Sequence, residues 1–171
     1  MNEKMLPYYT VLGRVMSNWD RLESGCMHVF TCLLQSPAAD ALYLSVRSFE
    51  ARLSLTKVVI AKLAKEDAQK RGLVLLEGVL NLSRQRNAVV HGQWIGGVSR
   101  NDYVVRFGLP EDWNQAAEVL RAYQTKNPSF QKKFHKHLYN LARLEKLADD
   151  IDALVAPVFA FGTAAEQALS C

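Results

Sequence analysis

The spacing of the apolar residues is the feature that most limits how this chain can fold. Over most of the sequence these residues recur every three or four positions, which is the period of an amphipathic helix. The first such stripe, which ends before Pro37, consists of Val11, Leu12, Val15, Trp19, Leu22, Cys26, Phe30 and Leu33. This pattern predicts a long first helix in an all-α fold.

Three further stripes predict the other main helices of a bundle. The second stripe ends in the polar stretch "KEDAQKRG", and the third runs from Leu73 to Gly92, a residue suited to the position after a helix end. The last begins at Phe134 and meets Pro157, which is expected to kink or end it. Members of the second and third stripes are Leu42, Val46, Phe49, Leu53, Ile60 and Ala64, then Leu75, Val79, Leu82, Val89 and Val90. We therefore predict an up-and-down bundle of four main helices, with residues 1–171 forming a single domain.

The helical period is interrupted between the third and fourth main helices. The segments "QWIGG", "VSRN" and "YVVRF" indicate two short strands around a Gly/Ser/Asn turn, which predicts a β-hairpin at about residues 93–108. A weaker helical pattern follows Pro110 and ends at "KNPS". We expect the hairpin to be an insertion after the third helix.

Composition and charge restrict the classes of function. The chain has 171 residues, 49% of them hydrophobic and 22% charged, which is typical of a globular domain that buries its own core. Its net charge of +4 permits an anionic partner such as nucleic acid but does not demonstrate one. Cys26, Cys32 and Cys171 lack CxxC spacing, so neither a disulfide framework nor a zinc site is expected.

Targeting and cofactor motifs are also not found in the sequence. The segment "MNEKMLPYYT" does not resemble an export signal, and the apolar runs are too short or too interrupted to span a bilayer. No Gly-rich phosphate loop, GxSxG or HExxH motif occurs. We therefore expect a cytoplasmic protein that has no membrane partner and needs no cofactor.

Polar residues crowd one stretch of the third helix, "RQRNAVVHGQW" at residues 84–94. The residues concerned are Arg84, Arg86, Asn87 and His91. On a helical wheel Arg86 falls within about 20° of Leu75, near the centre of the apolar stripe. A buried arginine needs an acidic partner, and Glu23 and Glu50 are the candidates because they lie in or beside the first two stripes.

A structural interpretation of each residue is also available. Arg86 can form an ion pair with Glu23 or Glu50, and Asn87 can simply face solvent. His91 can interact with the free carbonyl groups at a helix end, where Gly92 then stops the helix. A functional interpretation explains better why these residues occur together.

The segment "RNAVVHG", Arg86 to Gly92, resembles the signature of the HEPN superfamily (higher eukaryotes and prokaryotes nucleotide-binding). In that signature an arginine, usually followed by a polar residue, precedes a histidine by a few positions. The segment "NWDRLE", Asn18 to Glu23, is similar to an aromatic and acidic pattern of several bacterial members. The predicted bundle agrees too, so the resemblance covers most of the chain, with the hairpin as an addition.

This resemblance implies metal-independent RNA cleavage by a homodimer, with the two motifs in one composite groove. Arg86 and His91 are about 140° apart on an ideal helix, so a second subunit would help one ligand to meet both. His91 would accept the proton of the attacking 2′-hydroxyl or protonate the leaving oxygen. Arg86 would stabilise the charge on the phosphate, and Asn87 would orient either group. The products would be a 2′,3′-cyclic phosphate and a 5′-hydroxyl.

Other residues are weaker candidates for contacts with RNA. Arg84 and Trp94 are the candidate substrate-binding residues; Trp94 could stack on a base, although packing against the bundle is the favoured interpretation. The basic segment "QKKFHKH", residues 131–137, could attract RNA or could simply be solvated. His135 and His137 are two positions apart and face different ways on a helix, so a metal pair is not expected.

Two other classes of function remain open. The protein could be a catalytically silent HEPN-like interaction module, in which Arg86 and His91 serve dimer packing. It could also bind a nucleotide in the dimer groove, since a fold does not settle a function. A toxin or defence role would add an antitoxin protein to the expected partners, and a neighbouring antitoxin gene would favour it.

Overall fold

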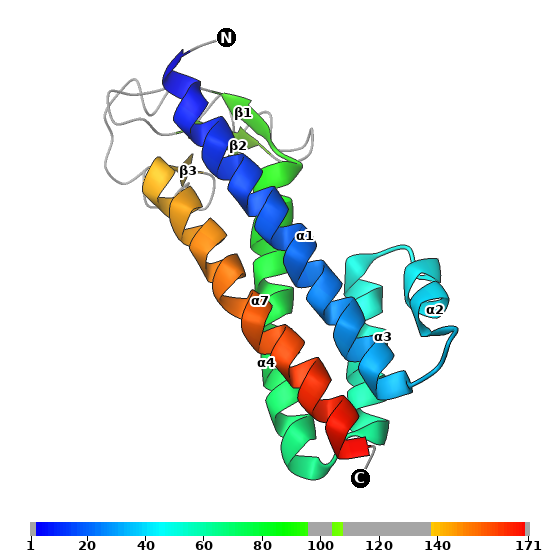
Figure 1. The fold of residues 1–171 in the computed structure, drawn as a ribbon. Coiled ribbons are helices and arrows are strands. Elements are labelled where there is room, and N and C mark those ends of the chain that lie inside the picture. Colours follow the sequence, from blue (N-terminus) through cyan, green and yellow to red (C-terminus); the bar gives the residue numbers. More distant parts are fainter. Residues whose placement is uncertain (1–2, 96–103, 108–137, 170–171) are drawn as a thin grey trace. The chain divides into compact units, whose positions relative to one another are not determined.

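The computed structural model describes residues 3–95, 104–107 and 138–169. Helices account for most of these residues, which confirms the predicted helical bundle at the level of fold class. The helices are η1 (Glu3–Met5), α1 (Leu6–Leu34), α2 (Ala39–Ser45), α3 (Phe49–Leu63), α4 (Glu66–Val90) and α7 (Leu141–Leu169). The strands are β1 (Gln93–Ile95), β2 (Val104–Phe107) and β3 (Leu138–Tyr139) (Figure 1).

Two compact units share these elements. The unit that we call the sheet unit comprises Met1–Val15 and Gln85–Ala148, and the bundle unit comprises Met16–Arg84 and Asp149–Cys171. Helices α1, α4 and α7 each contribute residues to both units. The assignment of residues 1–171 to a single domain stays a prediction.

The core of the bundle unit contains many residues of the predicted apolar stripes, but the second and third stripes are offset by one position near their starts: Tyr43 and Leu76 are buried, while Leu42 is 46% exposed. Each large aliphatic or aromatic side chain that is removed from water contributes about 1.5–3 kcal/mol, so the stripes supply the main driving force for packing. The buried residues include Trp19, Leu22, Cys26 and Phe30 from α1, Tyr43 from α2, Leu53 and Ile60 from α3, Leu76 and Val79 from α4, and Ile151 and Val158 from α7.

Helices α1 and α7 run in the same direction within the bundle unit. Arg21 of α1 forms an ion pair with Asp152 of α7 at 2.9 Å. Further along both helices, the thiol of Cys32 donates to Glu166 at 3.6 Å. Contacts that advance together along two helices show that the helices are parallel.

Helix α3 is parallel to α1 as well, while α4 runs the opposite way. The rings of Trp19 and Phe49 pack edge to face with their centroids 4.7 Å apart, and Glu23 and Arg52, further along both helices, form an ion pair. Against α3, the contacts of α4 run in reverse order, as shown by the pairs Glu50 with Arg84 and Lys57 with Glu77. The prediction that successive main helices alternate in direction therefore needs correction. Helix α2 carries the chain back to the start of α3, so α3 runs in the same direction as α1.

The second predicted helix is divided in two. Helix α2 ends at Ser45, and Ser48 begins α3 by accepting a hydrogen bond from the backbone N–H of Ala51 at 3.1 Å. This serine cap satisfies one of the backbone donors that a helix start leaves unpaired. The apolar period continues across the break through Val46 and Phe49, and for this reason the stripe alone did not indicate it.

Helix α4 begins earlier than its apolar stripe indicates. It starts at Glu66, so the polar stretch that was expected to separate two helices forms the first turns of α4. Glu66 and Asp67 lie in the first turn, where carboxylates interact favourably with the helix dipole. Lys, Glu and Gln are also good helix formers, although they add nothing to an apolar pattern.

Two glycines allow α1 and α7 to approach closely. A Cβ atom on Gly25 would lie 3.1 Å from Cγ1 of Val158, and one on Gly162 would lie 3.2 Å from the backbone Cα of Val29. These distances are tighter than ordinary van der Waals contacts, so a side chain at either position would press the helices apart. Both glycines are in helix interiors, where the residue is otherwise unfavourable by about 1 kcal/mol.

Helix α7 begins at a polar cap and continues past its proline. The side chain of Asn140 accepts a hydrogen bond from the backbone N–H of Arg143 at 2.8 Å, and α7 then runs from Leu141 to Leu169. Pro157 lies inside the helix and does not end it. The last predicted helix is therefore present, but it starts at Leu141 and not at Phe134, because Leu138–Tyr139 form β3.

The sheet unit contains a three-stranded antiparallel sheet in the order β1, β2, β3. Trp94 is opposite Arg106 in the first pair of strands, and Val105 is opposite Leu138 in the second. Strands β1 and β2 pair antiparallel within the range of the hairpin predicted at about 93–108, and β3, which is too short for a sequence pattern, adds a third strand. The predicted turn at 96–103, the weak helix after Pro110 and the basic segment 131–137 lie outside the described residues.

Candidate functional site

The candidate motif lies at the end of α4. The helix ends at Val90, and the backbone N–H of His91 donates to the carbonyl oxygen of Asn87 at 3.1 Å, which closes the last turn. His91 is exposed, and Gly92 follows it as expected for a helix stop. An imidazole at such a position is reachable by a large ligand such as a nucleic acid chain.

Arg86 and Asn87 contact each other one turn before this end. Nη1 of Arg86 donates to the side-chain oxygen Oδ1 of Asn87 at 3.1 Å. Arg86 is half-buried, with its Nε atom buried, while Asn87 is exposed. The predicted position of Arg86 near the centre of the apolar stripe implies a buried side chain, whereas Arg86 is only partly covered.

Arg84 differs from Arg86 because it is well exposed and has a carboxylate partner from α3. Its guanidinium lies 3.7 Å from Glu50, with exposed side-chain fractions of 64% and 67%. Such an exposed pair is weak, since water and salt screen it. The positive charge of Arg84 therefore stays available to attract a phosphate, as its predicted substrate-binding role requires.

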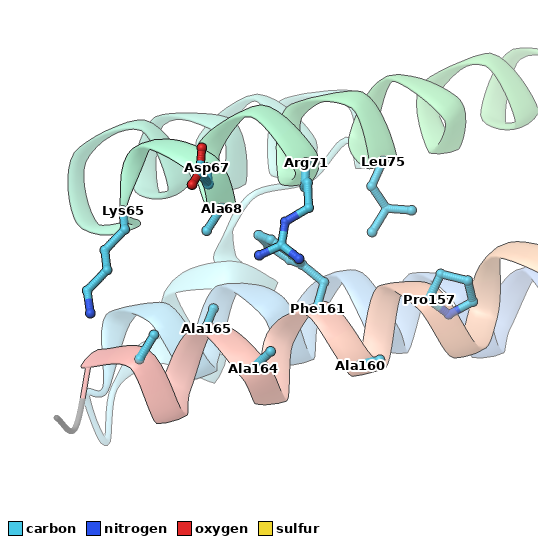
Figure 2. A pocket seen from close by; sticks show the side chains of 11 residues that line it. Lys65, Asp67, Ala68, Arg71, Leu75, Pro157, Ala160, Phe161, Ala164 and Ala165 are labelled. Carbon is cyan, nitrogen blue, oxygen red and sulfur yellow. The ribbon is translucent and has the colours of Figure 1, made fainter.

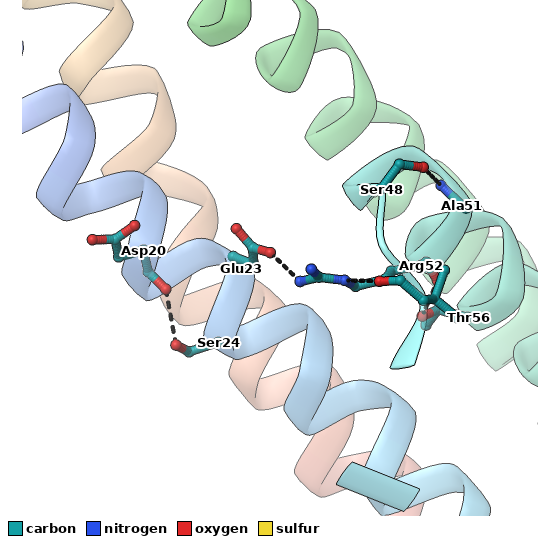
Figure 3. A network of polar contacts seen from close by, with 8 residues as sticks. Asp20, Glu23, Ser24, Ser48, Ala51, Arg52 and Thr56 are labelled. Atoms are coloured by element: carbon teal, nitrogen blue, oxygen red, sulfur yellow. Dashed lines mark hydrogen bonds and ion pairs between the residues drawn. The ribbon is translucent and has the colours of Figure 1, made fainter. Parts of the chain in front are cut away.

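Glu23 has a partner that the sequence did not reveal. Its carboxylate forms an ion pair with Nη1 of Arg52, whose Nε donates to the backbone oxygen of Val46 at 2.8 Å (Figure 3). The Arg52 guanidinium also lies over the ring of Tyr43, 5.6 Å from its centroid. Arg52 thus joins α1 to the connection between α2 and α3. The predicted pairing of Arg86 with Glu23 or Glu50 stays a prediction.

Two cysteines of the bundle unit are poorly suited to act as nucleophiles. Burial, with a smaller contribution from Glu23, raises the pKa of the Cys26 thiol to about 12. Burial and the adjacent carboxylate of Glu166 raise the pKa of the Cys32 thiol to about 11. Because the thiolate is the reactive form, both side chains are protonated and unreactive near neutral pH.

Trp94, the other candidate substrate-binding residue, lies on β1 only four positions after the end of α4. Its place next to the motif follows from the direct passage from α4 through Gly92 into the sheet. The substrate-binding role of Trp94 stays a prediction.

In residues 3–95, 104–107 and 138–169, no group of three or more His, Cys, Asp or Glu side chains is arranged to hold a metal ion. None of the helices in this part of the chain combines the length and apolar character needed to cross a membrane. Comparison of the chain with protein families, curated proteins and solved structures found no match.

Proposed function

We propose that the protein is a metal-independent endoribonuclease of the HEPN type, with Arg86, Asn87 and His91 as its catalytic residues. The observation that carries this proposal is the exposed His91 at the end of α4, one turn from the contact between Arg86 and Asn87. This stretch supplies a proton-transfer group, a phosphate-binding cation and an amide on consecutive turns. A ribonuclease that acts through the RNA's own 2′-hydroxyl needs these groups.

Each residue has a definite task in the proposed reaction. The 2′-oxygen forms a bond to the adjacent phosphorus, and the bond from phosphorus to the 5′-oxygen breaks. His91 accepts the 2′-hydroxyl proton or donates a proton to the leaving 5′-oxygen. Arg86 donates hydrogen bonds to the phosphate oxygens as negative charge accumulates there, and Asn87 orients the guanidinium through their mutual contact.

We infer that two subunits are needed for one complete site. A base and an acid are both required, and one chain contributes a single histidine at the end of α4. A two-fold axis beside the ends of two α4 helices would bring both copies of the motif to one phosphate. RNA is the proposed substrate, and an antitoxin protein that covers this groove would be the expected partner in a toxin system in the cytoplasm.

We expect the purified protein to cleave RNA at an unchanged rate when EDTA is present, because no step of the proposed reaction uses a metal ion. Sedimentation velocity on the same sample at micromolar concentration should show a homodimer. A fully active monomer would contradict the composite site. A dimer that leaves every RNA intact would favour the silent interaction module.

A further inference from the structure

A pocket of about 600 Å³ lies in the bundle unit, between the first turns of α4 and the last turns of α7 (Figure 2). Most of its lining is apolar, and eight of its eleven lining residues carry no polar side-chain atom. These are Ala68, Leu75, Pro157, Ala160, Phe161, Ala164, Ala165 and Ala168. Pockets of this size, apolar with a few polar groups, are typical of small-molecule sites.

The shape of the pocket depends on small residues along both helices. A Cβ atom on Gly72 of α4 would lie 2.5 Å from Cζ of Phe161, so the glycine is what lets this ring pack against α4. Ala160, Ala164 and Ala168 are four positions apart on α7 and therefore share one face. Longer side chains on this face would fill the space that the pocket occupies.

Two cations and one carboxylate complete the lining. The guanidinium of Arg71 points from α4 into the space beside Phe161, and Lys65 extends toward the end of α7 (Figure 2). Within the described part of the chain, the side chains of Arg71 and Lys65 form no ion pair or hydrogen bond, even with Asp67 one turn from Arg71. In contrast, Arg52 and Arg84 of the same unit are both paired with glutamates.

We propose that this pocket binds an amphipathic anion, a hydrocarbon chain that ends in a carboxylate. The chain would lie on the alanine face of α7 and against Phe161, where its burial is favourable. The carboxylate would accept paired hydrogen bonds from Arg71, with Lys65 adding positive charge. Charge complementarity selects an anion over a neutral chain, and the largely apolar lining selects a hydrocarbon body over a nucleotide.

Titration of the whole protein with decanoate below its micelle concentration tests this proposal, with calorimetry as the readout. We expect saturable binding of one decanoate per chain and much weaker binding of 1-decanol, which lacks the charge. Arg71→Gln should weaken decanoate binding about tenfold, the range for a partly screened charged hydrogen bond. Arg47→Gln is the matched control, because Arg47 is exposed, without a partner in the described residues, and absent from the lining.

Two further variants distinguish binding inside the pocket from binding to the surface around it. Ala164→Phe places a ring in the pocket from an exposed position on α7, so binding should be lost while helix content and melting temperature are retained. Asp67→Asn removes a repelling charge and should tighten binding. The proposal would be overturned by equal affinity for decanoate and 1-decanol, by unchanged binding in Ala164→Phe, or by the lack of saturable binding. RNA cleavage should be unaffected in Ala164→Phe, so the outcome is independent of the proposed nuclease.

Discussion

His91→Ala is expected to lower the rate of RNA cleavage about a hundredfold or more, the usual loss when a general acid or base is removed. His91 is exposed, and its contact with Asn87 is made by its backbone, which alanine retains. The variant should therefore keep the helix content and dimer of the wild type. Single-turnover cleavage of a labelled RNA, together with sedimentation, measures both properties.

Arg86→Ala tests the second catalytic residue, and Arg84→Ala is its matched control on the same helix. Arg86→Ala should also reduce cleavage by about a hundredfold, because it removes the group proposed to stabilise the transition state. Arg84→Ala removes the same charge from an exposed position and should have a much smaller effect. Cleavage that survives in both His91→Ala and Arg86→Ala would place the activity elsewhere or in a contaminant.

Arg52→Ala is expected to lower the free energy of unfolding by about 2 kcal/mol, because it leaves poorly solvated partners behind. The Arg52 side chain is 17% exposed and that of Glu23 is 30% exposed, so this pair is less screened by water than the other ion pairs of its unit. The substitution would remove the hydrogen-bond donor of both the Glu23 carboxylate and the Val46 carbonyl oxygen. Urea denaturation followed by circular dichroism gives the measurement.

The exposed pair of Arg84 and Glu50 supplies the comparison for this effect. Arg84→Ala should change the free energy of unfolding by no more than about 0.5 kcal/mol, as surface pairs usually do. Equal losses in Arg52→Ala and Arg84→Ala would show that the burial of the Arg52 pair adds nothing to stability.

The sequence predicted the fold best where the apolar period was long. The existence of the first and last helices was predicted because each has a stripe that spans many turns, although the start of the last helix was placed at Phe134 and not at Leu141. The break before α3 was missed, although Ser48 is a residue that often caps helices, because the stripe continues past it. The direction of α3 was not predicted, because the second stripe indicates one helix, whereas α2 and α3 are separate helices and the chain reverses between them.

For the candidate site, sequence patterns located residues but not their partners. The end of α4 near Gly92 follows from local periodicity, which also placed Arg86 nearer the core than its half-buried position. The pairing of Glu23 with Arg52 depends on the register between α1 and α3, which no local pattern contains. The pocket beside Arg71 was likewise hidden, because its two walls are more than 80 positions apart in the chain.

The most direct test of the proposed nuclease is the chemistry of its products. An RNA that is cut at one defined position should yield a 2′,3′-cyclic phosphate and a 5′-hydroxyl. The same strand with a single 2′-deoxynucleotide at that position should stay intact, because the attacking hydroxyl is missing. Mass spectrometry of both reactions distinguishes the outcomes. Cleavage of the deoxy-substituted strand, or a product with a 5′-phosphate, would contradict the mechanism.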